Sequence, residues 1–198
     1  MEAFVTPAKE EYYSKVMRIV RHISDTLQSP VYIYGGFLRN IIEGQEKVAD
    51  DIDLWIDAAH SETSWSRAIC HLRGACNFML SSMEYYNNRS VDYGLYRTVI
   101  DGLRFDISAP INGFNIFKNL SDFTCNNLYC TVDGVLNVRY RCAYSLVDHI
   151  EHIRQRRLVD ITNWKFIEHV QKYLFPNTDY YAKMAYRRDK MLAYGYEI

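Results

Sequence analysis

The chain has 198 residues, of which 48% are apolar and 24% charged, with 9 Gly and 4 Pro. This composition is typical of one large folded domain, or of a domain with a small addition, and it excludes collagen-like and disordered chains. The formal net charge of -1 is unevenly divided, because residues 1–138 carry 12 basic and 17 acidic side chains whereas residues 139–198 carry 11 and 7. The acidic part is suited to cations and the basic part to phosphate, although two solvated surfaces without a function would carry the same charges.

The N-terminal part predicts a helix, a strand and a second, shorter helix. From Lys9 to Gln28 apolar residues recur at intervals of three and four, which predicts an amphipathic helix that Ser29-Pro30 ends. A strand is expected at Val31–Tyr34. Gly35-Gly36 then breaks the strand, and a short helix is expected at Phe37–Glu43.

The next segment alternates between polar and apolar residues. Asp51–Asp57 has the strict period of two that is typical of a half-buried strand. We expect a helix at Ser61–Arg73 and a further strand at Asn77–Met83.

Two Asp-Gly dipeptides, at 101–102 and 133–134, each lie between β-prone runs and predict hairpins. The expected hairpin strands are Leu95–Ile100, Leu103–Ser108, Asn127–Val132 and Val135–Tyr140. The pattern then becomes helical, and the expected helices are Ala143–Arg154, Trp164–Leu174 and Asp179–Tyr194. We therefore predict an α+β fold, with a mixed sheet and flanking helices over residues 1–140 and a short helical segment over residues 141–198.

The sequence contains no apolar run long enough to span a membrane, and its N-terminus carries charges where a signal peptide would be apolar. We therefore expect an intracellular, cytoplasmic protein without membrane contact. The five cysteines lack C-x-x-C spacing, so we expect reduced thiols in the core. His149 and His152 lack a further ligand at a characteristic spacing, and we interpret them as a surface pair on a helix.

Three aspartates are candidate metal ligands. Asp51 and Asp53 leave the same face of their strand, and a neighbouring hairpin strand could bring Asp106 beside them. Crowded carboxylates repel one another unless a metal neutralises them, which favours Mg²⁺ or Mn²⁺. Taken alone, the pair also fits a solvent-facing strand edge, and Asp106 also fits an ion pair with Arg97 or Arg104.

The Gly35-Gly36 turn, followed by a helix that carries Arg39, is a candidate phosphate site, because glycines allow close approach to backbone N–H groups. It matches neither the Walker sequence nor the dinucleotide-binding pattern. A plain turn has the same sequence, so the dipeptide gains meaning only from the aspartates that follow it.

Four stretches carry a resemblance to a known family. They are GGFLRNIIEG at 35–44, DDIDLWI at 50–56, DFTCNNLY at 122–129 and, more loosely, DYYAKMAYRRDKMLAYGYEI at 179–198. In this order they resemble the motifs of the DNA polymerase β-like nucleotidyltransferase superfamily, and within it the head and part of the neck of tRNA CCA-adding enzymes and bacterial poly(A) polymerases. The resemblance implies that Gly35, Gly36 and Arg39 hold the triphosphate, and that Asp51 and Asp53 bind the metal ions.

The same resemblance implies roles for five further residues. Asp106 would be a third metal ligand or a general base. Asp122 and Asn126 would help to hold the incoming nucleotide, although both would serve equally well as turn or cap residues. Asp179 and Lys183 correspond to a pair in the helical neck that contacts the nucleotide base.

The implied activity is the metal-dependent transfer of a nucleoside monophosphate from a nucleoside triphosphate, with ATP as the expected donor, to an acceptor hydroxyl, with an RNA 3′ end favoured. The alternatives are a minimal transferase that modifies a small molecule or a protein, and a non-catalytic nucleotide- or RNA-binding subunit. The resemblance covers the head and part of the neck but not the body and tail domains with which the family grips tRNA. We therefore expect that an RNA acceptor would need contacts from the basic helical segment, a partner subunit or a second copy.

The sequence departs from the family pattern at four positions. Asn40 stands where the family has Asp, Leu120 and Ser121 stand where it has two Arg, and Tyr180 stands where it has a base-reading Asp. The absence of the two Arg and of the base-reading Asp argues against the donor selectivity of CCA-adding enzymes. These departures also favour the non-catalytic alternative.

Overall fold

The structure is a computed structural model that describes residues 7–44, 51–57, 78–88, 91–110, 121–173 and 179–198. Its helices are α1 (Pro7–Leu27), α2 (Gly36–Ile42), η1 (Thr124–Asn126), α5 (Leu146–Arg154), α6 (Trp164–Tyr173) and α7 (Tyr180–Ala193). Its strands are β1 (Val31–Tyr34), β2 (Ile52–Ile56), β3 (Phe78–Asn88), β4 (Val91–Ile100), β5 (Leu103–Pro110), β6 (Leu128–Thr131) and β7 (Leu136–Val138). None of the described helices combines the length and the apolar character needed to cross a bilayer.

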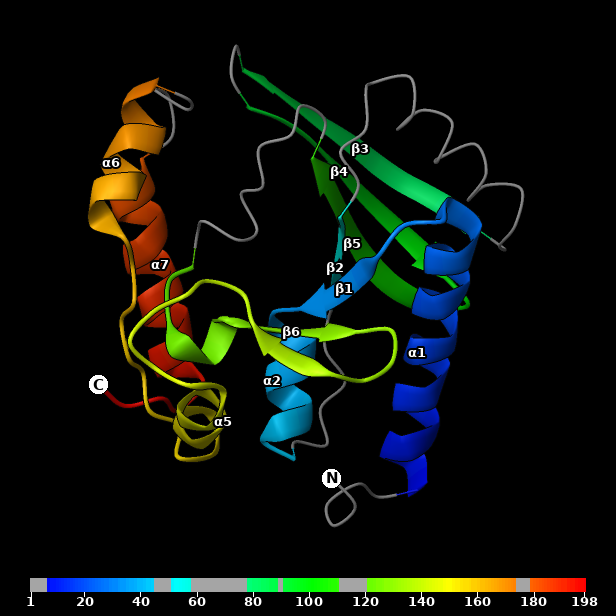
Figure 1. Cartoon of the computed structure of the whole chain (residues 1–198), viewed down its shortest axis with the longest axis horizontal. Coiled ribbons are helices and arrows are strands. Elements are labelled where there is room, and N and C mark those ends of the chain that lie inside the picture. Colours follow the sequence, from blue (N-terminus) through cyan, green and yellow to red (C-terminus); the bar gives the residue numbers. More distant parts are fainter. Residues whose placement is uncertain (1–6, 45–50, 58–77, 89–90, 111–120, 174–178) are drawn as a thin grey trace.

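The described strands form one sheet in the order β3-β4-β5-β2-β1-β6-β7. The pairing of β2 with β5 is parallel and the other pairings are antiparallel, so the sheet is mixed. Helix α1 lies on one side of the molecule and helices α5, α6 and α7 lie on the other (Figure 1). The predicted α+β class with a mixed sheet and flanking helices is confirmed.

One face of the sheet builds the core. Ile33, Leu54 and Ile107 lie side by side on β1, β2 and β5, and each is fully buried. The side of α1 that packs in the same core contributes Val16, Ile19, Val20 and Ile23. The apolar spacing that predicted this helix is therefore its buried face, and burial of each such side chain stabilises the fold by about 1.5–3 kcal/mol.

The two hairpins form at the predicted Asp-Gly dipeptides, but their strands differ in length from the prediction. Asp101 and Gly102 both have positive φ, 49° and 80°, as a two-residue hairpin turn requires. In the second hairpin the strands end early, because the side chain of Asn127 accepts the N–H of Tyr140 in place of a strand partner. Strand β3 continues to Asn88, beyond the predicted end at Met83. The predicted helix 61–73 lies outside the described residues.

Helix α5 begins three residues later than predicted. Ser145 caps it, and the side chains of Ser145 and Asp148 form a reciprocal capping box with the backbone. The interpretation of His149 and His152 as a surface pair is wrong, since both are buried, with 0% and 8% of their surface exposed. They are buried because α5 packs against η1, where the imidazole of His152 contacts the Thr124 hydroxyl at 3.2 Å.

The segment after residue 140 packs on the sheet unit through both backbone and core. Thr124 N donates to Val159 O at 3.0 Å, and Ile161 N donates to Asp122 O at 2.9 Å. The hydrophobic core that contains the sheet residues also contains Leu158. The C-terminal helices are thus held against the part of the sheet where β6 begins.

A buried hydrogen-bond network fixes the start of this segment. The Asn127 amide lies 3.0 Å from His149 Nε2 and donates to Tyr140 O at 2.8 Å. His149 Nδ1 lies 2.6 Å from the Ser145 carbonyl, which can only accept, so Nδ1 carries the proton and Nε2 accepts from Asn127. With this tautomer, the polar side-chain atoms of Asn127 and His149 all have hydrogen-bond partners.

We expect Asn127→Ala to lower the free energy of unfolding by about 2–3 kcal/mol, because it leaves buried groups of Tyr140 and His149 without partners. Urea denaturation measures this change. Asn137→Ala is the matched control, since its amide makes one exposed contact, and it should cost less than about 1 kcal/mol. Equal losses in the two variants would contradict the structural role of the network.

Candidate active site

The polar face of the sheet carries a row of functional side chains. Tyr34 on β1 is paired in register with Asp53 on β2, and Asp53 is paired with Asp106 on β5. Arg97 on β4 is the next member of the row, with Nε 3.5 Å from Asp106 Oδ2. Asp51 precedes β2 by one residue and is exposed. The structure therefore brings Asp106 beside Asp53, as the alternation predicted.

The electrostatics of Asp53 reflect this crowding. Burial, and then the negative charges of Asp51 and Asp106, raise the pKa of Asp53 from 3.8 to about 7. The positive charges of Arg139 and Arg187 act in the opposite direction. The acidic side chains are thus close enough to disfavour one another's ionisation, which a cation at this place would relieve.

Gly35 is required by the close approach of the turn to Asp53. Its φ is +73°, and a Cβ atom at this position would overlap the Asp53 carboxylate. Gly36 has ordinary space, since a Cβ there would lie 3.5 Å from the Arg39 guanidinium. Of the two glycines in the predicted turn, the steric constraint therefore falls on the first.

Arg39, Asn126 and Asp122 form a chain of hydrogen bonds beneath the turn. Arg39 Nη1 donates to Asn126 Oδ1 at 2.7 Å, and Asn126 Nδ2 donates to Asp122 Oδ1 at 3.2 Å. Asp122 is buried and also accepts the N–H of Phe123 at 2.7 Å. Three predicted site residues are thus brought together, but they bind one another.

Arg39 also contacts the C-terminal end of the chain. Its guanidinium lies 5.6 Å from the centre of the Tyr194 ring and 3.9 Å from the Glu43 carboxylate. Tyr196 donates a hydrogen bond to the same carboxylate, and burial, followed by this hydrogen bond, raises the pKa of the Tyr196 phenol. Helix α2 and the last residues of the chain are therefore fixed to each other.

Two arginines at the site were not among the predicted site residues. The Arg139 guanidinium is buried 4.7 Å above the Tyr34 ring, and burial lowers the pKa of Arg139. Arg187 Nη1 on α7 donates to Asp122 Oδ2 at 3.0 Å. The sequence contains a signal for Arg187, because it lies on the stripe of α7 whose other members, Tyr180, Met184 and Met191, are buried.

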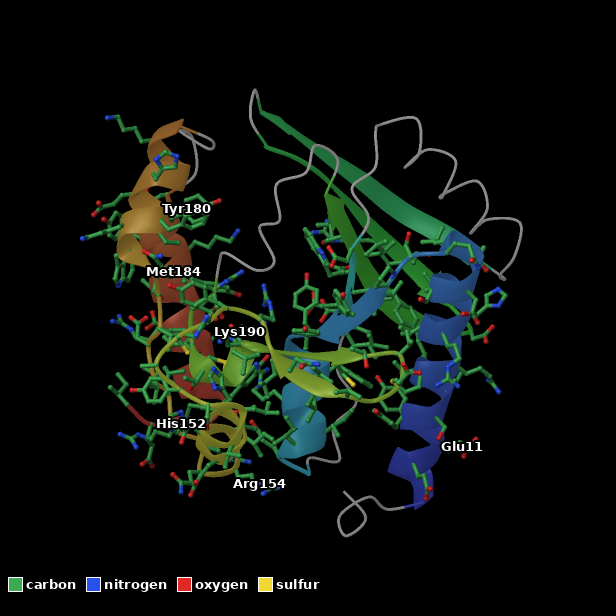
Figure 2. The ribbon with its side chains drawn as sticks, in the orientation of Figure 1. Glu11, His152, Arg154, Tyr180, Met184 and Lys190 are labelled. Carbon is green, nitrogen blue, oxygen red and sulfur yellow. The ribbon has the colours of Figure 1, made fainter. Side chains whose placement is uncertain are left out.

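Asp179 and Lys183 lie at the start of α7, which Figure 2 follows from Tyr180 through Met184 to Lys190. The Asp179 carboxylate caps the helix by accepting the N–H of Ala182 at 2.9 Å. Lys183 Nζ lies 5.7 Å from the centre of the Tyr180 ring. The structure gives both residues local contacts on α7 and does not bring them against the aspartates.

The acidic row has the donor chemistry that suits a hard divalent cation, since carboxylate oxygens are the ligands that Mg²⁺ prefers. Within the described ranges, no three His, Cys, Asp or Glu side chains are grouped closely enough to hold a metal ion by themselves. Asp106 is turned to Arg97 at 3.5 Å. Asp51 and Asp53 are therefore the residues most available to a cation, with Asp106 able to join them on leaving Arg97.

We expect Gly35→Ala to cost about 1–3 kcal/mol more in unfolding free energy than Gly44→Ala. Both glycines have similar positive φ, +73° and +69°, but a Cβ at Gly44 meets no atom within 4 Å. The difference between the variants therefore reports the overlap with Asp53 together with the strain of the Gly35 backbone, whose ψ is −143°. Chemical denaturation measures it, and equal costs would show that the turn does not constrain Asp53.

Asp53 should make stability depend on pH. Because its folded pKa of about 7 lies above its ordinary value of 3.8, the folded chain keeps a proton between these values that the unfolded chain has lost. Stability from this group therefore falls as the pH rises from about 4 to 7. We expect Asp53→Asn to be more stable than the wild type at pH 8, by on the order of 2 kcal/mol, and no more stable near pH 4.

Urea denaturation at the two pH values measures the effect, with Asp133→Asn as the control at an exposed aspartate. The control should change stability little and equally at both pH values. A gain for Asp53→Asn that is the same at both pH values would contradict the crowding of the three carboxylates.

No protein-family model matches this chain, and no curated protein matches it in sequence. Solved structures do match. The Thermotoga maritima CCA-adding enzyme complexed with tRNA is 17% identical with a TM-score of 0.54, and the match covers 85% of this chain and 36% of that one. A CCA-adding enzyme in complex with CTP is 18% identical with a TM-score of 0.54 over the same shares of the two chains.

A CCA-adding enzyme in an apo form is 15% identical with a TM-score of 0.52, and the match covers 91% of this chain and 44% of that one. The chain therefore spans less than half of the length of these enzymes. The resemblance that the motifs indicated is confirmed for the fold: this chain has the nucleotidyltransferase-like fold found in CCA-adding enzymes.

Proposed function

We propose that this protein is a metal-dependent nucleotidyltransferase that moves a nucleoside monophosphate from a nucleoside triphosphate to an acceptor hydroxyl. The observation that carries the proposal is the in-register pairing of Asp53 with Asp106, with Asp51 two residues before Asp53 and the Gly35 turn directly above it. Carboxylates at this density are costly for a fold, as the raised pKa of Asp53 indicates, and a catalytic role accounts for them.

Asp51 and Asp53 would hold Mg²⁺ or Mn²⁺, with Asp106 as a third ligand or as the general base. The bound ion would polarise the phosphoryl oxygens and neutralise charge on the departing pyrophosphate. As a base, Asp106 would accept the proton of the acceptor hydroxyl, whose oxygen forms a bond to the α-phosphorus. The bond from that phosphorus to the bridging oxygen breaks, and pyrophosphate leaves.

The other predicted residues would organise the nucleotide. Gly35 and Gly36 would allow the triphosphate to approach the backbone of the turn, and Arg39 would add a positive charge below it. Asp122 and Asn126 would keep Arg39 in position through the hydrogen bonds that join them. Asp179 and Lys183 are proposed at the base end of the nucleotide.

ATP is the proposed donor and an RNA 3′ end the proposed acceptor. Support comes from the solved relatives, which include CCA-adding enzymes in complex with tRNA, with CTP and with ATP. RNA would be gripped by the basic segment 141–198, which we propose as a neck-like unit beside a head of residues 1–140. We also propose that a partner subunit or a second copy of the chain adds contacts to the RNA.

A non-catalytic nucleotide- or RNA-binding role is the second candidate. The observation that favours it is that Arg39, Asn126 and Asp122 form hydrogen bonds with one another instead of presenting those groups to a substrate. Such a protein would bind a nucleoside triphosphate without turning it over.

The test is incubation of the full chain with Mg²⁺ or Mn²⁺, each α-labelled nucleoside triphosphate in turn, total RNA and cell extract. We expect label transfer by the wild type and a loss of at least about 10³-fold in the Asp51→Ala/Asp53→Ala variant, because both proposed metal ligands are removed. Asp133→Ala, at an exposed turn, should transfer label at the wild-type rate.

The labelled band identifies the acceptor class. A labelled RNA supports the main proposal, whereas a labelled protein or small molecule supports a minimal transferase. Triphosphate binding without transfer under either metal would favour the non-catalytic role, and transfer that persists in the double variant would reject the assigned site.

A further inference from the structure

Helix α7 brings a partly exposed positive charge to the buried carboxylate of Asp122. Arg39 is held by Asn126 and Glu43, and its side chain is only 10% exposed. Arg139 is half-buried, with its Nε nitrogen buried and its guanidinium above the Tyr34 ring. The side chain of Arg187, by contrast, is 42% exposed while it contacts Asp122. Of these three guanidinium groups, that of Arg187 is therefore the one that a ligand can reach.

Asp122 holds the Arg187 side chain in place while engaging one of its guanidinium nitrogens. Arg187 Nη1, one of the two terminal nitrogens, donates to Asp122 Oδ2 at 3.0 Å. Among the described residues, Asp122 is the hydrogen-bond partner of the Arg187 side chain. A guanidinium has five N–H donors in a planar fork, so a carboxylate on one edge leaves the other edge for a phosphate. The buried Asp122 thus orients the fork and reduces the entropy that binding would cost.

Arg187 is close to the acidic row as well as to a second cation. Its positive charge is a minor influence on the pKa values of Asp53 and Arg139, and it acts to lower both. Lys183 lies one helical turn before it on α7, and burial, followed by the Arg187 charge, lowers the pKa of Lys183. Positive charges that are close enough to disfavour one another favour a shared anion. A chain of phosphates can span the two neighbouring cations.

We infer that Arg187, oriented by Asp122, binds the phosphate chain of the nucleotide, and that Lys183 is its second contact on the same face of α7. This rests on the proposed nucleotidyltransferase function and extends it, because it assigns phosphate binding to a helix outside the glycine turn. It also changes the role proposed for Lys183 from base contact to phosphate contact.

One consequence is that docking of the C-terminal segment supports substrate binding. Helix α7 is anchored at its end by the backbone, where Leu158 N donates to Glu197 O and Glu197 N donates to Arg156 O at 2.8 Å. This backbone pairing helps to hold α7, and with it Arg187, in place.

The experiment uses the full chain and inorganic tripolyphosphate as the probe, in calorimetric titrations at constant Mg²⁺ and increasing KCl. We expect Arg187→Ala to weaken binding at least tenfold and to reduce the slope of log Kd against log salt concentration by about one, as the loss of one phosphate contact does. Arg188→Ala is the matched control. Arg188 is the next residue of the helix, is similarly exposed and pairs with Asp189, so both quantities should stay at wild-type values.

Arg187→Ala also removes the ion pair of the buried Asp122, so lower stability alone would weaken binding. Arg187→Lys separates the two effects, because it keeps the charge while losing the fork, and we expect it to retain the wild-type salt slope whatever its melting temperature. Wild-type affinity and slope in Arg187→Ala would overturn the inference while leaving the proposed function intact. Failure of the wild type to bind tripolyphosphate or ATP would overturn both.

Discussion

The repulsion between Asp53 and Asp106 is the constraint around which the site is organised. Parallel pairing of β2 with β5 places Asp53 and Asp106 side by side on the same face of the sheet. Their charges are offset by positive groups from three directions, since Arg97 comes from β4, Arg139 follows β7 and Arg187 comes from α7. Elements as distant in sequence as β4 and α7 thus both place positive charge near the same pair of carboxylates.

The same constraint explains why the C-terminal helices are packed so closely on the sheet unit. Arg187 reaches the site because Asp122 receives it, and Asp122 is held in turn by Asn126 and by the backbone of Phe123. The family pattern has two arginines directly before Asp122, where this chain has Leu120 and Ser121. In this chain α7 brings the Arg187 guanidinium to Asp122. The helical segment therefore packs against the candidate site as well as stabilising the fold.

The elements that the sequence predicted well are those whose cause is local. Strand β1 and the Asp101-Gly102 hairpin follow from alternation and from a dipeptide that tolerates positive φ, and both lie where expected. The placement of Asp106 beside Asp53 could also be predicted, because both are polar positions on alternating strands. The shortened hairpin at β7 could not, since it depends on the side chain of Asn127, whose buried partner His149 lies 22 residues away. The burial of His149 could not be predicted either. It results from the packing of α5 against η1, a short turn that has no periodic sequence pattern.

The register of β2 ties the chemistry of this protein to its stability. Asp53 and Leu54 are adjacent in sequence and face opposite sides of the sheet, with Leu54 fully buried between β1 and β5. A slip of one residue would exchange them, turning the carboxylate into the apolar layer and the leucine out of it. Burying an unpaired carboxylate in that layer costs far more than a single hydrogen bond contributes. A chain folded in the wrong register would therefore be unstable, and the apolar core thereby selects the register that places Asp53 on the polar face beside Asp106.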